Sequence, residues 1–233
     1  MNEYRSPEKT LNMTLEVLSC APRVFEIQNF LSEVEIQHLI SVAKRTSLSK
    51  SSTAGGSDNS RDSKSSTRTS YNSWLERSRD AIIDAVYRRG ADLLRIDESL
   101  LRDRKKFEIT DLDHTESIAE HLQLVHYDPG QEYTAHHDFG YPDVNDASQP
   151  ARFSTLLLYL NENVVGGETE FPRWYNGETK GGLRAKPVSG KAVLFYSQLP
   201  DGNMDDLSHH AALPVRDGEK WLINLWVWDP QRR

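Results

Sequence analysis

The chain contains a single cysteine, Cys20, among 233 residues, so no disulfide can form within it. No apolar run approaches the ~18 residues that a membrane-spanning helix needs. The first ten residues, MNEYRSPEKT, lack the apolar core of a signal peptide, so we expect neither a secretory leader nor membrane contact. The compartment stays open: cytoplasmic as the chain stands, or endoplasmic reticulum if a targeting segment was removed.

Acidic residues outnumber basic ones, with 35 Asp and Glu against 28 Lys and Arg. The formal net charge is −7, and no stretch gathers enough lysine and arginine to form a basic patch. Such a chain is poorly suited to binding nucleic-acid phosphates, so we expect no nucleic-acid partner. With 37% hydrophobic and 27% charged residues, the composition is typical of a globular protein.

The N-terminal part predicts one or two short strands and two helices. Residues 1–14 are polar and predict weak order, and apolar residues then alternate through 17–30 around Pro22. Ser32 followed by Glu35 forms a capping-box pattern, which predicts a helix over about 33–45. Apolar residues at helical spacing predict a second, longer helix over 74–96, in which Gly90 could weaken or bend the structure.

Residues 46–70 consist mostly of Ser, Thr, Gly, Asp and Asn, so they cannot bury an apolar face. The segment is either a flexible surface loop or a mobile lid over a cleft, since long irregular loops in compact domains often have a function. The polar residues 97–118 predict irregular structure with one helical turn.

From Leu122 onward, short segments rich in β-branched and aromatic residues alternate with turn sequences. We therefore expect an α+β, mainly β, protein with a sandwich or barrel of antiparallel strands. The amphipathic helices need the sheet to cover them, so we treat 1–233 as one domain, with a helical region over about 15–118 and a β core over about 119–230. The expected strands cover 122–127, 152–162, 168–172, 191–198 and 220–228.

His136 and Asp138 provide the first indication of chemistry. In an extended strand, residues i and i+2 lie on the same face, so the imidazole and the carboxylate should be neighbours. A histidine and a carboxylate held in this way are two thirds of a facial triad for non-haem iron(II). His137, between them, should face away from the metal.

The third ligand has three candidates in the β half: His126, His209 and His210. His38, His114 and His121 are less favourable, because they lie in or near the helical half. Lys220 begins the last expected strand, and a lysine inside a barrel is costly unless it is paired. A dicarboxylate bound to the metal at one end could supply that pairing, with hydroxyl donors from Tyr127 and Tyr159.

Four motifs occur in one order along the chain: YxxGQxYxxHxD (127–138), LYLNENVVGGETEFP (158–172), AKPVSGKAVLFYSQLPDG (185–202) and HHAALPVRDGEKW (209–221). Their joint order is far more specific than a lone His-x-Asp pair. Together with the Arg-Thr-Ser sequence at 68–70, they make the chain resemble the prolyl 4-hydroxylases of plants, algae and animals, over about residues 24–229. These enzymes are iron(II)/2-oxoglutarate dioxygenases.

The resemblance implies a double-stranded β-helix, or jelly roll, with the N-terminal helices packed on its major sheet. It implies that His136, Asp138 and His210 hold iron, and that Lys220 binds the far carboxylate of 2-oxoglutarate with help from Tyr127. Asn224 lies where family members commonly have a threonine near the cosubstrate. The implied cofactors are Fe(II), 2-oxoglutarate and O₂, with ascorbate.

For a peptide substrate, the resemblance implies contacts from Tyr133, Arg152 and Trp226, with residues 46–70 as the lid. Three departures from the family pattern leave the iron chemistry intact but concern substrate identity. Trp228 replaces a common histidine, Leu213 replaces the usual cysteine, and Gly140 follows Phe139 where a second bulky residue is common.

We therefore expect an enzyme that hydroxylates peptidyl proline to 4-hydroxyproline, with release of succinate and CO₂. An alternative within the same chemistry is an oxygenase acting on a free amino acid, a small metabolite or a non-proline side chain. A non-catalytic binding module is a third hypothesis, which the complete triad and Lys220 disfavour.

Overall fold

The computed structural model describes residues 11–51, 67–109, 112, 114–140, 149–177 and 182–232. Within these ranges the helices are α1 (Glu33–Arg45) and α2 (Ala81–Leu94), with 3-10 turns at Arg77–Arg79, Glu98–Leu101 and Asp206–Ser208. The strands are β1 (Thr14–Cys20), β2 (Arg23–Gln28), β3 (Ser49–Lys50), β4 (Tyr71–Leu75), β5 (Leu122–Tyr127), β6 (Tyr133–His136), β7 (Arg152–Tyr159), β8 (Val164–Gly166), β9 (Thr169–Phe171), β10 (Leu183–Ala185), β11 (Ala192–Tyr196), β12 (His210–Ala212), β13 (Val215–Gly218) and β14 (Lys220–Trp228).

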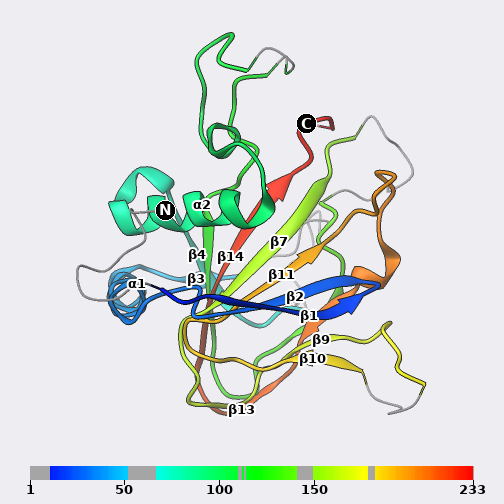
Figure 1. Ribbon diagram of the computed structural model, residues 1–233. Helices are drawn as coiled ribbons and strands as arrows, with labels where there is room; N and C mark the ends of the chain where they lie inside the picture. The colour runs from blue at the N-terminus through cyan, green and yellow to red at the C-terminus, as the bar shows by residue number, and fades with distance from the viewer. Residues whose placement is uncertain are drawn as a thin grey trace, which may run out of the picture.

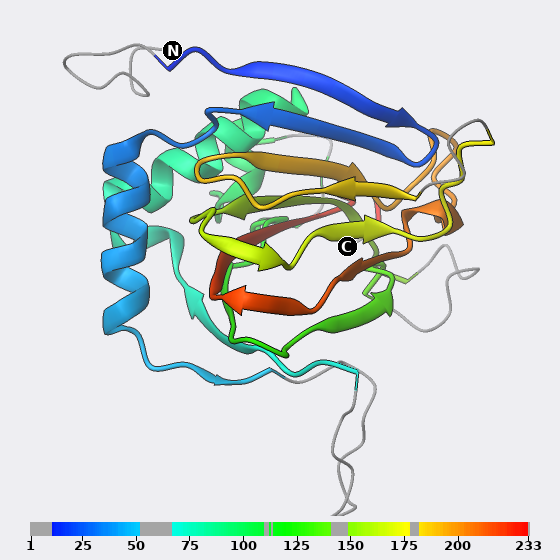
Figure 2. The same ribbon diagram turned by 90° about the horizontal axis from the view of Figure 1, so that it is seen from below.

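The described strands form antiparallel sheets. The largest has the order β1-β2-β11-β7-β14-β5-β4-β3, a second has the order β10-β9-β12-β6, and β13 pairs with β8. Figures 1 and 2 show the helices beside the large sheet and the smaller sheet on its other side. The protein is thus mostly β with few helices, an arrangement consistent with a jelly roll. None of the described helices is long and apolar enough to cross a membrane.

Alternation along the strands of the large sheet divides the buried residues into two cores. One core joins α1 and α2 to the first face of the sheet, through residues such as Leu39, Val86 and Leu225. The other fills the space between the two sheets, around residues such as Tyr127 and Phe171. The large sheet is therefore buried on both faces, and its inner face points towards the smaller sheet.

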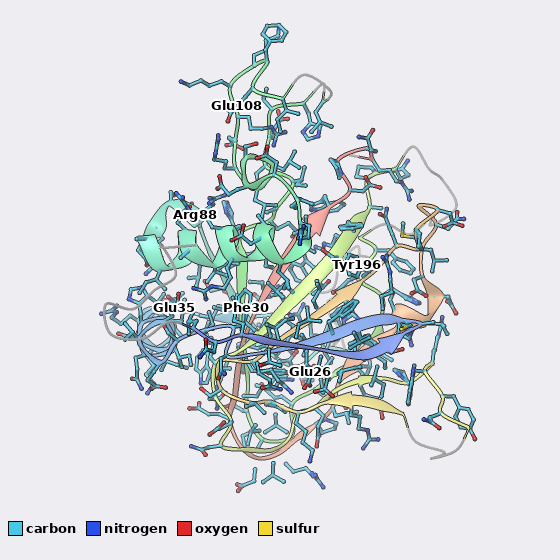
Figure 3. The ribbon with its side chains drawn as sticks, viewed as in Figure 1. Glu26, Phe30, Glu35, Arg88, Glu108 and Tyr196 are labelled. Carbon is cyan, nitrogen blue, oxygen red and sulfur yellow. The ribbon has the colours of Figure 1, made fainter. Side chains whose placement is uncertain are left out.

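The predicted capping box begins α1 as expected. The Ser32 hydroxyl accepts from the Glu35 backbone N–H at 3.3 Å, and the Glu35 carboxylate accepts from the Ser32 N–H at 2.7 Å. The same carboxylate binds the buried guanidinium of Arg89 on α2 at 2.6 Å, and Arg89 also donates to the carbonyl of Phe30. Figure 3 labels Glu35 and Phe30 at this junction. Because the guanidinium is 2% exposed, its pairing ties α1 to α2 inside the core.

The helix predicted over 74–96 was wrong at its start. Trp74 and Leu75 belong to β4, where Leu75 is fully buried on the helix side and Trp74 is 47% exposed on the other face. Leu75 matched the helical period by coincidence, whereas Asp80 is the true N-cap of α2. Gly90 lies inside α2, where an added Cβ would come within 3.2 Å of Leu225, so this glycine allows close packing against the sheet.

Asp80 makes a testable contribution to stability. Its Oδ1 accepts from the N–H groups of Ile82 and Ile83 at 3.0 Å each, and its Oδ2 lies 2.9 Å from His38 Nε2 on α1. Asp80→Ala should lower the free energy of unfolding by about 1–2 kcal/mol, measured by urea denaturation, because the cap is lost. Asp80→Asn, which keeps the acceptor, should lose less, and an unchanged midpoint for Asp80→Ala would contradict this role.

The remaining expectations about the fold are partly confirmed. Irregular structure with one helical turn over 97–118 matches the 3-10 turn at Glu98–Leu101, and residues 1–10 lie outside the described ranges. Most of the expected lid, 52–66, also lies outside them. The short strands β8, β10, β12 and β13 were not predicted, because three or four residues show no clear alternation.

Candidate active site

Two histidines meet where β6 pairs with β12. His136 lies opposite His210 in register, and their ring centroids are 4.4 Å apart. His136 Nδ1 donates to the carbonyl of Thr134 at 2.8 Å. His210 Nδ1 donates to the carbonyl of Ser208 at 3.0 Å. With the proton on Nδ1, the Nε2 atom of each ring keeps its lone pair for a metal ion.

Asp138 completes the cluster. Its Oδ1 lies 3.6 Å from His136 Nε2, and its Oδ2 lies 3.6 Å from His210 Nε2. One ligand atom from each of the three residues can be chosen so that all lie within 4.8 Å of one another. In the described part of the chain this is the only such group of His, Cys, Asp and Glu residues. Two imidazoles and one carboxylate are a donor set that suits iron(II).

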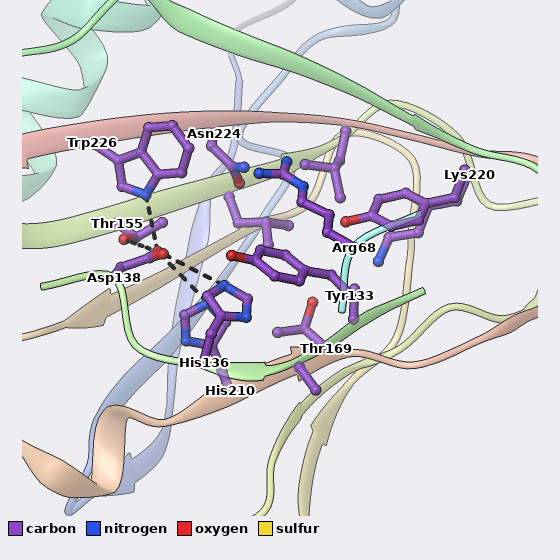
Figure 4. A pocket seen from close by; sticks show the side chains of 15 residues that line it. Arg68, Tyr133, His136, Asp138, Thr155, Thr169, His210, Lys220, Asn224 and Trp226 are labelled. Atoms are coloured by element: carbon purple, nitrogen blue, oxygen red, sulfur yellow. Dashed lines mark hydrogen bonds and ion pairs between the residues drawn. The ribbon is translucent and has the colours of Figure 1, made fainter. Parts of the chain in front are cut away.

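The two carboxylate oxygens of Asp138 have different surroundings. Oδ2 accepts hydrogen bonds from the Thr155 hydroxyl at 2.7 Å and from the indole N–H of Trp226 at 2.9 Å. Figure 4 shows both donors converging on the carboxylate beside the two histidines. Thr155 and Trp226 are register partners on β7 and β14, so the sheet itself places them. This anchoring directs Oδ1 towards the metal position.

The pKa values of Asp138 and His210 depend on burial and on the neighbouring members of the cluster. Burial raises the pKa of Asp138, but His210 and His136 outweigh this effect and hold it well below its ordinary value. Burial lowers the pKa of His210 to about 4, with a further contribution from His136. Near neutral pH the cluster is therefore a carboxylate with a neutral His210, which is the protonation state that metal binding requires.

Lys220 lies in the same pocket and is 1% exposed. Its ammonium donates to the carbonyl of Gly167 at 2.6 Å and lies 5.1 Å from the ring centre of Tyr127. None of the ion pairs among the described residues includes Lys220. Burial lowers its pKa from 10.5 to about 7. A buried ammonium without a carboxylate partner is costly, and an anionic ligand would relieve that cost.

Three further residues were expected to contact the cosubstrate, and two of them line the pocket. Tyr127 lines the pocket, and burial raises its pKa, so its hydroxyl remains a donor. Asn224 also lines the pocket and donates to Gln123 Oε1 at 3.3 Å. Tyr159 is not among the residues that line it, and its hydroxyl instead pairs with Thr169 Oγ1 at 2.8 Å. Thr169 lines the pocket, and the ring centre of Tyr159 lies 5.6 Å from the Lys220 ammonium.

The residues expected to contact a peptide lie together at the metal end of the pocket. The ring of Tyr133 stacks on His136, with centroids 3.6 Å apart. The guanidinium of Arg152 lies 4.1 Å from the ring centre of Trp226. Arg152 also donates to both carboxylate oxygens of Glu120, at 2.6 and 3.1 Å. Tyr133 and Trp226 line the pocket, whereas Arg152 stands just outside it.

A β-bulge determines where Arg152 points. Along the pairing of β7 with β14, Val227 is opposite Ser154 but Trp228 is opposite Arg152, so Phe153 is an extra residue. Phe153 packs towards the helix-side core. The bulge turns Arg152 to the same face of the sheet as Thr155, which plain alternation would not do.

Three functional candidates were missed from the sequence. Thr155 and Thr169 are single polar residues within apolar strands, and both are 1% exposed. Arg68 was noticed only as part of a motif, yet it lines the pocket at 6% exposure. It donates to Ser70 Oγ and Gln123 Oε1, both at 3.1 Å. The available signal was a polar residue at an inward position of a strand.

The remaining histidines lie elsewhere. His137 turns away from the cluster, and its Nε2 donates to the carbonyl of Asp206 at 3.1 Å. His209 lies beside His137, with ring centroids 4.7 Å apart. His126 stacks on Trp221 at 4.0 Å and lies outside the pocket. Of the three candidates for the third ligand, the structure brings His210 to the pair.

A His-Asp-His cluster with a buried lysine, on facing antiparallel sheets, defines the class of 2-oxoglutarate- and iron(II)-dependent oxygenases. A sequence model described as the 2OG-Fe(II) oxygenase superfamily matches residues 122–228, which contain all four of these residues.

Curated relatives narrow the class. The "Probable prolyl 4-hydroxylase 3" of Arabidopsis thaliana is 36% identical over 224 residues, covering 91% of this chain and 71% of the relative. "Prolyl 4-hydroxylase 2" of the same plant is 32% identical over 237 residues, covering 95% and 73%. The chain belongs to the prolyl 4-hydroxylase family.

A solved structure agrees with this assignment. The viral collagen prolyl hydroxylase of Paramecium bursaria Chlorella virus-1, solved as its 2OG complex, has a TM-score of 0.63 and 26% identity. The match covers 88% of this chain and 95% of that one. A prolyl hydroxylase from Trichoplax adhaerens, solved with a peptide fragment of hypoxia inducible factor, shares the fold at a TM-score of 0.61 and 17% identity.

Proposed function

We propose that this chain is an iron(II)- and 2-oxoglutarate-dependent dioxygenase that hydroxylates proline within a polypeptide to 4-hydroxyproline. Succinate and CO₂ are the co-products. The observation that carries the proposal is the His136, Asp138 and His210 cluster in one pocket with the buried Lys220, whose ammonium has no carboxylate partner among the described residues. The named activity of the relatives supports the choice of proline as the substrate residue.

The ligand atoms in this proposal are Nε2 of His136, Nε2 of His210 and Oδ1 of Asp138. The residues fit the metal, because both Nδ1 atoms and Oδ2 already have protein partners. When bound, iron(II) with 2-oxoglutarate supplies the oxidising chemistry that inserts an oxygen atom of O₂ into a substrate C–H bond. Ascorbate, as is typical of the family, would keep the iron reduced.

Lys220 would bind the carboxylate of 2-oxoglutarate that lies far from the metal. The ammonium comes from the first residue of β14, and Tyr127, its register partner on β5, adds a hydroxyl. Thr169 and Asn224 line the same pocket. These contacts orient the cosubstrate so that its other end points at the three ligands, and the burial of the site keeps bulk water away.

The polypeptide would enter where Tyr133, Trp226 and Arg152 lie. Tyr133 stacks on His136 and Trp226 holds Asp138, so both side chains join the peptide region to the metal ligands. Residues 46–70, proposed as a lid over the peptide, lie mostly outside the described residues. We also propose that 1–233 is one jelly-roll domain, in which the helices of 15–118 support the β core of 119–230.

Thr155 provides a quantitative check on this arrangement. Thr155→Val keeps the shape of the side chain but removes the donor to Asp138 Oδ2, so iron(II) binding should weaken by about tenfold. The measurement is an anaerobic calorimetric titration with iron(II). Ser154→Ala, one residue earlier on β7, is the control and should bind as the wild type does. Equal affinity in Thr155→Val would remove this hydrogen bond from the metal site.

The decisive experiment is mass spectrometry of a panel of proline-containing peptides incubated with the protein, iron(II), ascorbate and 2-oxoglutarate. A gain of one oxygen atom on proline supports the proposal. Succinate formation stimulated by a free amino acid, a small metabolite or a non-proline side chain would instead favour the alternative within the same chemistry.

A further inference from the structure

The edge strand β1 exposes a row of apolar side chains. In the order of the large sheet β1 comes first, and it pairs only with β2 among the described strands. Figure 2 shows it as the outermost strand, with no other described element beyond it. Met13, Leu15 and Val17 are 44%, 50% and 53% exposed, respectively. In the described part of the chain, both the hydrogen-bonding edge of β1 and its apolar row are therefore open.

This apolar row continues the core that lies between the helices and the large sheet. Leu15 is the register partner of Ile27, and Val17 is that of Phe25. Ile27 belongs to the core on the helix side, and Phe25 packs against it. Because Ile27 is 2% exposed whereas Leu15 beside it is half exposed, the cover that the helices provide ends between β2 and β1. A further strand along β1 would bury the rest of this surface.

The other edge strands in the described ranges are shorter than β1. β3, β6, β8, β10 and β13 have two to four residues each. Short edge strands and bulges are means by which proteins avoid pairing with other copies. β1 has seven residues, and its only irregularity is the register shift between Val17 and Ser19. Its first part is therefore a regular, exposed strand with a free edge.

Antiparallel pairing of β1 with a second β1 has one register that suits its sequence. With a two-fold axis perpendicular to the sheet at Leu15, this residue faces its own copy, and Val17 faces Met13 of the second chain. On the other face of the sheet Glu16 faces Thr14, so no like charges are opposed. An axis at Glu16 would place two carboxylates opposite each other, and an axis at Val17 would reach the bulge.

Residues 1–10, MNEYRSPEKT, are the alternative occupant of this edge within the chain. They contain Pro7 and lack an alternation of apolar residues, so their sequence does not favour a strand that would cover Leu15 and Val17. We propose that β1 is the interaction surface for a second copy of this chain, which forms a two-fold dimer by antiparallel β1–β1 pairing centred on Leu15. This inference is independent of the proposed function.

The first test is the mass of the full chain in solution. Sedimentation equilibrium at about 10–100 µM should show a concentration-dependent dimer with twice the mass of one chain. Leu15→Lys should raise the dissociation constant by about 100-fold or more, because two ammonium groups would replace the apolar contact at the axis. Val34→Lys is the matched control, since Val34 is 64% exposed on α1, and it should dimerise as the wild type does. Circular dichroism should show the same fold in all three proteins.

Mixing variants of opposite charge tests the register. Leu15→Glu and Leu15→Lys should each be monomeric, whereas their equimolar mixture should form a one-to-one dimer in native mass spectrometry, since position 15 faces its own copy. A mixture of Val17→Glu and Val17→Lys is the control and should show no such gain, because Val17 faces Met13. A wild type that stays monomeric, a dimer that Leu15→Lys leaves intact, or a position-15 mixture without the mixed dimer would overturn the inference.

Discussion

Asp138→Ala should abolish iron(II) binding and reduce 2-oxoglutarate turnover to background. The substitution removes the carboxylate and leaves two imidazoles, with the Thr155 and Trp226 donors unsatisfied. His136→Ala and His210→Ala should have the same effect, because each removes one of three ligands. Anaerobic titration with iron(II) and succinate assays measure binding and turnover separately.

The adjacent histidines provide matched controls for this experiment. His137→Ala and His209→Ala change the residue next to a ligand, but the rings of His137 and His209 lie beside each other, and His137 Nε2 is bonded to Asp206. Both variants should bind iron(II) as the wild type does. Iron-dependent succinate production that persists in Asp138→Ala would exclude Asp138 from the ligand set.

Lys220→Met should raise the 2-oxoglutarate concentration needed for half-maximal turnover by about 100-fold or more, because it removes the charge that pairs with the far carboxylate. Iron(II) binding should be unaffected, since Lys220 is not one of the three clustered ligands. An unchanged 2-oxoglutarate requirement would refute the assigned role. Lys191→Met is the control, because this buried lysine is paired with Glu26 instead of lining the pocket.

The pKa of Lys220 adds a pH dependence. Burial lowers it to about 7, so the free protein loses the ammonium as the pH rises through that value, and affinity for dianionic 2-oxoglutarate should fall in the same range. Stability should change in the opposite direction. Between about pH 7 and 10 the unfolded chain holds the proton that the folded chain has released, so the wild type gains stability as the pH rises. Lys220→Met should be the more stable protein at neutral pH, and this advantage should shrink over that interval.

Local signals explain what could be predicted about the fold. The capping box at Ser32 and the long strand β14 are determined by residues that are close together in the sequence, so their positions could be predicted. β4 could not, because Leu75 fitted a helical period and only its pairing with β5 makes it a strand. β12 has three residues, and its conformation depends on β6 and β9, which are distant in sequence.

The site also depends partly on local sequence and partly on long-range pairing. Strand alternation pointed to His136 and Asp138, and the residues alone left three candidates for the last ligand, among which the family resemblance chose His210. The antiparallel pairing of β6 with β12 brings His210 to the pair, and that register could not be derived from local residues. Tyr159 faces the correct side of β7, yet a neighbouring threonine takes its hydroxyl, which depends on side-chain packing alone.

The extra residue Phe153 interrupts the alternation of side chains along β7, so the residues before and after it follow separate in-and-out patterns. After the bulge Thr155 donates to Asp138, and before it the guanidinium of Arg152 lies over the ring of Trp226. Deleting Phe153 would remove the bulge but leave Arg152 two positions before Thr155, so both side chains would stay on the same face of the sheet. The bulge therefore adds the ring of Phe153 to the helix-side core without moving either polar side chain away from the pocket side of the sheet.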